Sequence, residues 1–142
     1  MQNKRSKWKN QFQQIDSASK FHEKIRSIFQ EDPFFRNLSC FQEVPVSALV
    51  NSYTSNRHCV DWYIDELGMI LELHGEQHYA MANYGNIPYE EAVKQFNNIK
   101  YRDNEKKLAL TQAGYEYREI SYKLKNKITA ALLKEILLNE EK

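Results

Sequence analysis

The sequence predicts an α/β fold, in which a mixed central sheet is flanked by helices and the elements follow the order αβββαβα. Apolar residues recur at helical spacing in three segments, and segments rich in strand formers lie between them. The chain has neither an internal repeat nor a low-complexity stretch. Elements in this order suit a single sheet that is covered by helices.

Three helices are expected from the spacing of apolar residues. In the first, Phe21, Ile25 and Phe29 share one face, and Pro33 closes the segment. The second ends at Gly114, which is expected as a helix C-cap, and it forms either one helix or two. The expected helices cover residues 19–30, 89–113 and 128–138.

Four segments rich in strand-forming residues are expected to build the sheet. In the first of them Pro45 indicates an edge or a bulge, because proline cannot donate to a central ladder. The turn from Asp65 to Gly68 joins the second and third segments into a hairpin. The expected strands cover residues 40–46, 58–64, 69–73 and 115–122.

Length and charge limit the class of protein. A chain of 142 residues fits one domain of ordinary size. We expect a basic N-terminal arm over residues 1–18 and a single domain over residues 19–142. The net charge of +1 excludes a strongly basic, histone-like nucleic-acid binder, so any DNA affinity must come from local patches.

Signals for export or membrane insertion are missing from the sequence. The first ten residues are basic and contain no apolar run, which excludes a secretory signal peptide. No segment has the apolar length of a membrane helix. Cys40 and Cys59 lack metal-type spacing and are expected to be reduced and buried. We therefore expect a cytoplasmic protein without a membrane partner.

Two acidic residues of the expected hairpin form a candidate metal site. Asp61 lies in one strand and Glu72 near the end of the next, so the hairpin would bring both carboxylates to one end of the sheet. Mg²⁺ is typically held by one or two carboxylates together with waters and substrate phosphate, and the backbone carbonyl of Leu73 would add an oxygen. Such an ion activates water and offsets charge on a phosphoryl oxygen.

The residues that follow this strand are rich in ligand and base types. Residues 72–78 run ELHGEQH, with His74 and His78 directly after an apolar strand. A neutral imidazole can take a proton from metal-bound water near neutral pH. A purely structural role would not need two histidines here.

These residues carry a resemblance to a known superfamily. The segment VDWYIDELGMILELHGEQHY resembles the PD-(D/E)XK nucleases, and within them the very-short-patch-repair-like and phage homing-endonuclease-like members of EDxHD type. The downstream segment FNNIKYRDNEKKLALTQAGYEYREISY is similar to the same members. The resemblance implies a restriction-endonuclease-like fold, hydrolysis of DNA phosphodiester bonds, and Mg²⁺ as the cofactor, with Mn²⁺ as a substitute.

The resemblance also implies roles for single residues. Asp61 matches the metal-binding acid and Glu72 the acid of the second motif. His74 stands where most members have a lysine, and His78 matches a histidine that acts as base or acid. Asp103 matches the acid that completes the site.

Three further residues are candidates for the same site. Glu23 of the first helix is the candidate for an assisting glutamate. Lys106 and Lys107 are candidates to touch a phosphate or stabilise the leaving group, although one of them, not both, can point at the site.

Each assignment has a structural alternative. His74 could only donate a hydrogen bond in the turn before Gly75, and Asp103 could only cap the helix that follows it. Glu23 could be a solvated residue paired with Arg26. The two lysines could be solvated, as lysines on a helix face usually are.

DNA would be held mainly through its phosphates. The basic arm either reaches a DNA groove or is a disordered, solubilising tail. The polar loop that ends at Arg57 is either a contact surface or a plain connector, and Gln77 either positions substrate or forms a turn. The candidate DNA-binding residues are Lys4, Arg5, Lys7, Trp8, Lys9, Arg57, Gln77, Lys123, Lys125 and Lys127.

Three functions therefore compete. The leading one is a metal-dependent DNA endonuclease, and the second is a resolvase or repair nuclease that acts on branched or mismatched DNA. The third is a nuclease fold that no longer cuts and serves as a DNA-binding module, which the histidine at position 74 favours. Small nucleases often cut both strands as dimers, so a second copy of the chain is a candidate partner besides DNA.

Overall fold

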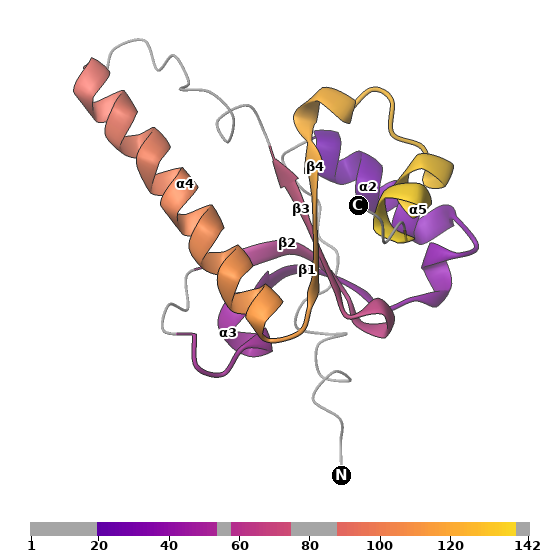
Figure 1. The fold of residues 1–142 in the computed structure, drawn as a ribbon. Coiled ribbons are helices and arrows are strands. Elements are labelled where there is room, and N and C mark those ends of the chain that lie inside the picture. Colours follow the sequence, from indigo (N-terminus) through magenta and orange to yellow (C-terminus); the bar gives the residue numbers. More distant parts are fainter. Residues whose placement is uncertain (1–19, 54–57, 75–87, 139–142) are drawn as a thin grey trace.

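The computed structural model describes residues 20–53, 58–74 and 88–138. These residues form a mixed four-stranded sheet with helices on both faces, and Figure 1 shows α4 on one side of the sheet and α2 and α5 on the other. The predicted α/β class with a flanked mixed sheet is confirmed. The main elements follow the expected order, and the described residues add one short α-helix, α3 (Val46–Leu49), and the 3₁₀ turns Phe35–Asn37, Asp65–Leu67 and Tyr122–Leu124.

The sheet has the strand order β1-β2-β3-β4. Neighbouring strands are antiparallel from β1 to β3, whereas β3 and β4 are parallel. β1 is therefore an edge strand, as Pro45 indicated, and this proline is its last residue. The strands are β1 (Cys40–Pro45), β2 (Cys59–Ile64), β3 (Met69–His74) and β4 (Glu116–Ser121).

A tight turn joins β2 and β3 into the expected hairpin. The residues Asp65–Leu67 form one 3₁₀ turn, and Gly68 follows in the left-handed region with φ of 57°. A side chain is disfavoured in that conformation, which explains glycine at this position. The register then pairs Ile64 with Met69 and Trp62 with Leu71, so that the site-bearing ends of the two strands lie together.

Apolar side chains cover the first face of the sheet. Helix α2 (Lys20–Glu31) buries Phe21, Ile25 and Phe29, as the spacing predicted. These residues share one core cluster with Trp62 of β2 and with residues of α5 (Ala130–Leu138). Packing of this kind is the main source of helix stability in proteins, and it fixes α2 relative to the sheet.

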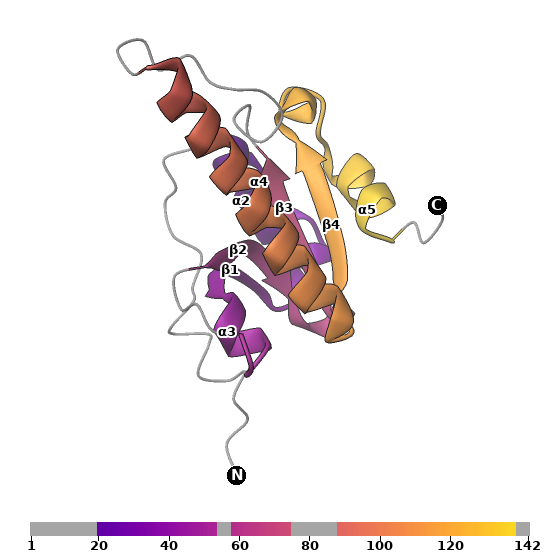
Figure 2. The same ribbon diagram turned by 60° about the vertical axis from the view of Figure 1, so that its left-hand side comes forward.

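The second face of the sheet is covered by α4 (Tyr89–Gln112), a single continuous helix. Its residue Leu110 is fully buried in the core cluster of this face. The helix is followed by Gly114 with φ of 100°, in agreement with the expected C-terminal glycine. Figures 1 and 2 show that α4 runs along the sheet and extends beyond its strands.

Several predicted boundaries were wrong by one or two residues; the third expected helix, for example, begins at Ala130 and not at residue 128. Val46 was expected to end the first strand, but it begins α3, because Pro45 has an extended backbone and the next four residues turn into a helix.

Cys40 and Cys59 are both free and partly buried. Among the described helices, none combines the length and the apolar character required to cross a bilayer.

Candidate active site

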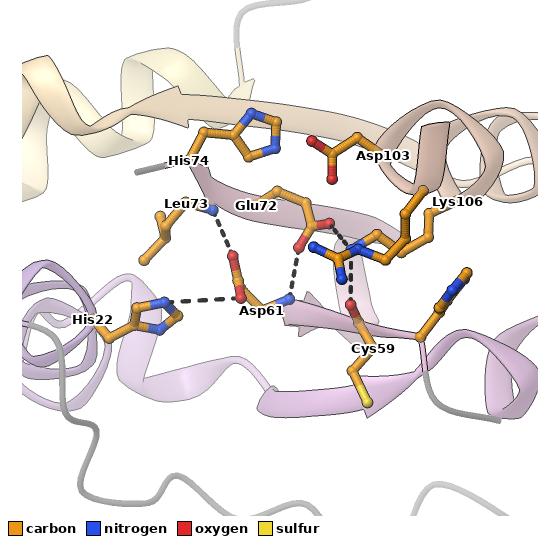
Figure 3. A pocket seen from close by; sticks show the side chains of 10 residues that line it. His22, Cys59, Asp61, Glu72, Leu73, His74, Asp103 and Lys106 are labelled. Atoms are coloured by element: carbon orange, nitrogen blue, oxygen red, sulfur yellow. Dashed lines mark hydrogen bonds and ion pairs between the residues drawn. The ribbon is translucent and has the colours of Figure 1, made fainter. Parts of the chain in front are cut away.

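The carboxylates of Asp61 and Glu72 meet where the paired part of the β2–β3 hairpin ends. The Asp61 N–H donates to Glu72 Oε1 at 2.8 Å, and the Leu73 N–H donates to Asp61 Oδ2 at 2.7 Å (Figure 3). Each carboxylate thus accepts a backbone N–H of the neighbouring strand, in place of a backbone carbonyl oxygen. The hairpin brings the two carboxylates together, as the sequence led us to expect.

A lysine and a tyrosine hold the second oxygen of Glu72. Lys106 Nζ donates to Glu72 Oε2 at 2.7 Å and to the carbonyl oxygen of Cys59 at 2.9 Å. The Tyr117 hydroxyl donates to the same Oε2 at 3.0 Å. Glu72 is 2% exposed and Lys106 is 7% exposed, so this ion pair is buried. Charge-assisted bonds of this kind fix the orientation of the carboxylate.

Of the two candidate lysines of α4, Lys106 points at the site. Lys107 is half exposed, and its Nζ lies 3.8 Å from Glu119 Oε1 and 5.8 Å from the Tyr117 ring. The sequence allowed one of the two, and the structure selects Lys106.

A polar cavity of about 290 Å³ opens over the two carboxylates. Asp103 and Lys106 reach it from α4, Asp61 from β2 and Glu72 from β3 (Figure 3). Strands and helices are rigid supports, so these side chains are held in fixed relative positions. The cavity is lined by His22, His58, Cys59, Asp61, Glu72, Leu73, His74, Arg102, Asp103 and Lys106.

Asp103 lies in the interior of α4 and is 7% exposed. The alternative that it only caps the start of a helix is therefore wrong, because α4 begins at Tyr89. Helix periodicity puts Asp103 and Lys106 one turn apart on the same face, and both line the cavity.

Burial raises the pKa of Asp61 well above its ordinary value, and the negative charge of Glu72 raises it further. The Leu73 N–H and the charge of Lys106 act in the opposite direction. Burial, and then the charge of Glu72, also raise the pKa of Tyr117, which keeps its hydroxyl proton for donation.

Helix α2 contributes His22 to the cavity, whereas Glu23 is exposed and does not line it. His22 Nε2 lies 3.8 Å from Asp61 Oδ1, and the His22 side chain is 16% exposed. Burial lowers the pKa of His22, and the charge of Glu72 opposes this effect. The imidazole is therefore neutral near pH 7.

The other two cavity histidines have different neighbours. His74 is 7% exposed, and its Nε2 lies 3.7 Å from Glu119 Oε2 on the parallel strand β4. The Nδ1 atom of His58 lies 2.6 Å from the Tyr53 hydroxyl. The Tyr53 hydroxyl thereby orients the His58 ring, whereas the His74 ring lies near the Glu119 carboxylate.

Two of the candidate DNA-binding lysines lie near this end of the sheet. Ser121 of β4 pairs with His74, and Lys123 and Lys125 follow directly after it, both exposed. Lys24 Nζ donates to the carbonyl oxygen of Lys125 at 3.0 Å, which connects this segment to α2. Lys127 is exposed as well.

Several expected site residues fall outside the part of the chain that the structure describes. They include His78, the candidate base, and the arm of residues 1–18. These residues are Lys4, Arg5, Lys7, Trp8, Lys9, Arg57, Gln77 and His78.

Sequence reasoning missed five contributors to the site, among them Cys59, whose carbonyl oxygen accepts from Lys106. Helix periodicity signals His22, because it lies three residues before the buried Ile25. No local pattern signals His58, Arg102 or Tyr117, whose positions depend on the packing of β4 and α4 against the hairpin.

Comparison with known proteins does not assign the chain to a family. No family model matches the chain, and no curated protein sequence matches it. Within residues 20–53, 58–74 and 88–138, no three His, Cys, Asp or Glu side chains are grouped closely enough to form a metal site by themselves. The chemistry of this site must therefore be argued from its geometry.

Proposed function

We propose that the chain is a metal-dependent DNA endonuclease that hydrolyses phosphodiester bonds. The observation that carries this proposal is the pair Asp61 and Glu72, two carboxylates on adjacent strands that open onto a polar cavity beside a buried lysine. The resemblance of the segment that contains both residues to PD-(D/E)XK nucleases also supports it. We also propose the restriction-endonuclease-like topology of that superfamily.

The two carboxylates fit the requirements of Mg²⁺. This ion is usually held by one or two carboxylates, with waters and substrate phosphate completing its coordination, so a cluster of three protein side chains is not required. Glu72 already accepts three hydrogen bonds, yet a carboxylate has about four lone-pair sites. The raised pKa of Asp61 indicates that a cation at this position would relieve unfavourable negative charge.

Asp61, Glu72 and the carbonyl oxygen of Leu73 are the proposed ligands of Mg²⁺, or of Mn²⁺ in its place. The ion supplies activation of water and stabilisation of charge on the phosphoryl oxygens.

Lys106 reaches the cavity from helix α4 and is proposed to bind the substrate phosphate. An ammonium group has three N–H donors. Two of them bond Glu72 and Cys59, which leaves the third for an oxygen of the substrate phosphate. Most members of the superfamily have a lysine at the strand position of His74. In this proposal Lys106 supplies the same positive charge from helix α4.

The remaining candidates have secondary roles in this proposal. His78 is the proposed base, and Asp103 and His74 hold protons or orient groups at the edge of the cavity. The basic side chains Lys123 and Lys125 contact the DNA backbone, which makes binding dependent on salt. DNA is the proposed partner, and the cytoplasm is the proposed location.

A plasmid cleavage assay tests the proposal. Purified protein should nick or linearise supercoiled plasmid with Mg²⁺ or Mn²⁺, and EDTA should stop the reaction. Asp61→Asn should be inactive, while Glu116→Gln should keep full activity, because Glu116 is an exposed carboxylate at the far end of β4. Protein that shifts DNA on a gel but cuts no plasmid, mismatched duplex or four-way junction would contradict catalysis and favour a DNA-binding module.

A further inference from the structure

The two oxygens of Asp61 face different neighbours. Oδ2 accepts the Leu73 N–H at 2.7 Å, so this oxygen is tied to the sheet. Oδ1 faces His22 Nε2 across 3.8 Å (Figure 3). An oxygen of a metal-binding carboxylate thus lies opposite an imidazole nitrogen.

The distance between these two atoms suits two ligands of one ion. Protein ligands lie about 2.1 Å from a small divalent cation, so two donors on one ion are at most about 4.2 Å apart. The separation of 3.8 Å between Asp61 Oδ1 and His22 Nε2 lies between the roughly 3.0 Å of adjacent octahedral ligands and this limit, so a small rotation of one side chain would place both atoms on one ion.

The fold holds His22 in this position. Phe21 and Ile25, on either side of His22 in α2, are 5% and 0% exposed and belong to the core cluster that packs on the sheet. The His22 side chain is itself 16% exposed. Little conformational entropy would be lost when such a preorganised side chain binds an ion.

We propose that His22, in place of Glu72, is the second side-chain ligand of the cation held by Asp61, because both oxygens of Glu72 already accept hydrogen bonds, and that the site therefore binds transition-metal ions such as Mn²⁺ and Co²⁺ more tightly than Mg²⁺. This inference rests on the proposed metal-dependent function. Mg²⁺ prefers oxygen ligands, whereas imidazole nitrogen suits first-row transition metals. Waters and substrate oxygens complete the coordination, as in catalytic sites that keep open positions.

Pulsed electron paramagnetic resonance on Mn²⁺ tests the inference without DNA and without turnover. Mn²⁺ added to the wild-type protein should show coupling to an imidazole nitrogen. His22→Gln should remove this coupling, because the amide keeps a hydrogen-bond donor but is a poor nitrogen ligand. His58→Gln is the matched control, since His58 lines the same cavity beside Tyr53, and it should keep the coupling.

Calorimetric titration with Co²⁺ and Mg²⁺ gives a second measurement. His22→Gln should weaken Co²⁺ binding at least about tenfold, since even residues that only orient a ligand change metal affinity by that factor. Mg²⁺ affinity should change less than Co²⁺ affinity. An equal loss for both ions would show that His22 only positions Asp61, and would overturn the inference.

The outcomes separate this inference from the proposed function. Nitrogen coupling that survives in His22→Gln, or wild-type protein that binds no Mn²⁺, overturns the ligand role of His22. Plasmid cleavage with Mg²⁺ would still support the endonuclease proposal in that case. Conversely, wild-type protein that binds Mn²⁺ through His22 but cuts no DNA would overturn the endonuclease and leave the metal site standing.

Discussion

Asp61 donates a backbone hydrogen bond to the carboxylate of Glu72 at the point where the β2–β3 ladder ends. The backbone of Asp61 donates to the Glu72 carboxylate, and the Asp61 carboxylate accepts from the backbone of Leu73. Each carboxylate is therefore both a structural acceptor and a candidate ligand. Substitutions at these positions must be designed so that lost chemistry is not confused with lost structure.

The first prediction concerns catalysis by Asp61. Asp61→Ala should lower the rate of plasmid cleavage at least about 10²-fold, because a metal ligand contributes several kcal/mol to transition-state stabilisation. The fold should remain although the Leu73 N–H loses its acceptor, since Asp61 lies beside the cavity and its side chain is 24% exposed. Gel assays of initial rates and circular dichroism check the two parts. Retained cleavage would refute the metal assignment.

The second prediction concerns the pH dependence of stability. Burial and the charge of Glu72 raise the pKa of Asp61 in the folded state, so the folded protein binds this proton more tightly than the unfolded chain does. Ionised Asp61 therefore lowers the free energy of unfolding as pH rises from its ordinary pKa of 3.8 through the raised value. Asp61→Asn should remove this penalty.

Asp61→Asn should accordingly be more stable than the wild type at neutral pH in EDTA, and the gain should vanish on acidification. Urea denaturation between about pH 4 and pH 8 measures this difference. Asn keeps an oxygen that can accept the Leu73 N–H, so the sheet contact is preserved. A gain that is constant over the whole range would contradict the predicted cause.

The third prediction concerns His78, whose proposed role rests on the resemblance of the sequence alone. His78→Ala should lower kcat about 10²-fold or more, the usual contribution of a general base, and change DNA binding little. Single-turnover cleavage and gel shifts separate the two effects. A change confined to binding would remove His78 from the catalytic role.

The sequence predicts most of the fold because its signals are local. The face of Phe21, Ile25 and Phe29, the turn at Gly68 and the terminal glycine at position 114 each specify an element from neighbouring residues alone. The hairpin then brings Asp61 to Glu72, since strands joined by a tight turn must pair. Local sequence patterns and the hairpin connection are therefore enough to predict that Asp61 and Glu72 lie together.

The remaining contributors depend on contacts between distant segments. Tyr117 reaches Glu72 because β4 is parallel to β3, and this register has no signature in either strand. Periodicity could have favoured His22 over Glu23, because Glu23 lies two residues before the buried Ile25 and thus on the opposite face of the helix. The resemblance suggested a glutamate, and the face of the helix indicates the histidine.

Helix periodicity could not choose between Lys106 and Lys107. These residues follow Asp103 by three and four positions, so both lie on the same side of α4 as the site. Lys106 enters the site because it forms an ion pair with the buried Glu72. Lys107 lies instead near Glu119 and the Tyr117 ring. Contacts with other segments therefore determine which of the two lysines enters the site.

The fourth prediction concerns the buried pair of Lys106 and Glu72. Lys106→Met should lower the free energy of unfolding by about 3–5 kcal/mol, because it leaves the Glu72 carboxylate buried without its cation. Lys107→Met is the matched control and should change stability by less than about 0.5 kcal/mol, since Lys107 is exposed. Urea denaturation of both variants measures the difference.

A double variant shows whether the cost arises from the unpaired charge. Glu72→Gln combined with Lys106→Met should recover most of the stability that Lys106→Met loses, because the amide of Gln is neutral, its oxygen can still accept the Asp61 N–H, and its NH2 group can donate to the Tyr117 hydroxyl oxygen. Cleavage should remain absent in the double variant, since both the ligand and the cation are gone. If the double variant is as unstable as Lys106→Met, the lysine stabilises the fold by packing against the hairpin and not by neutralising Glu72.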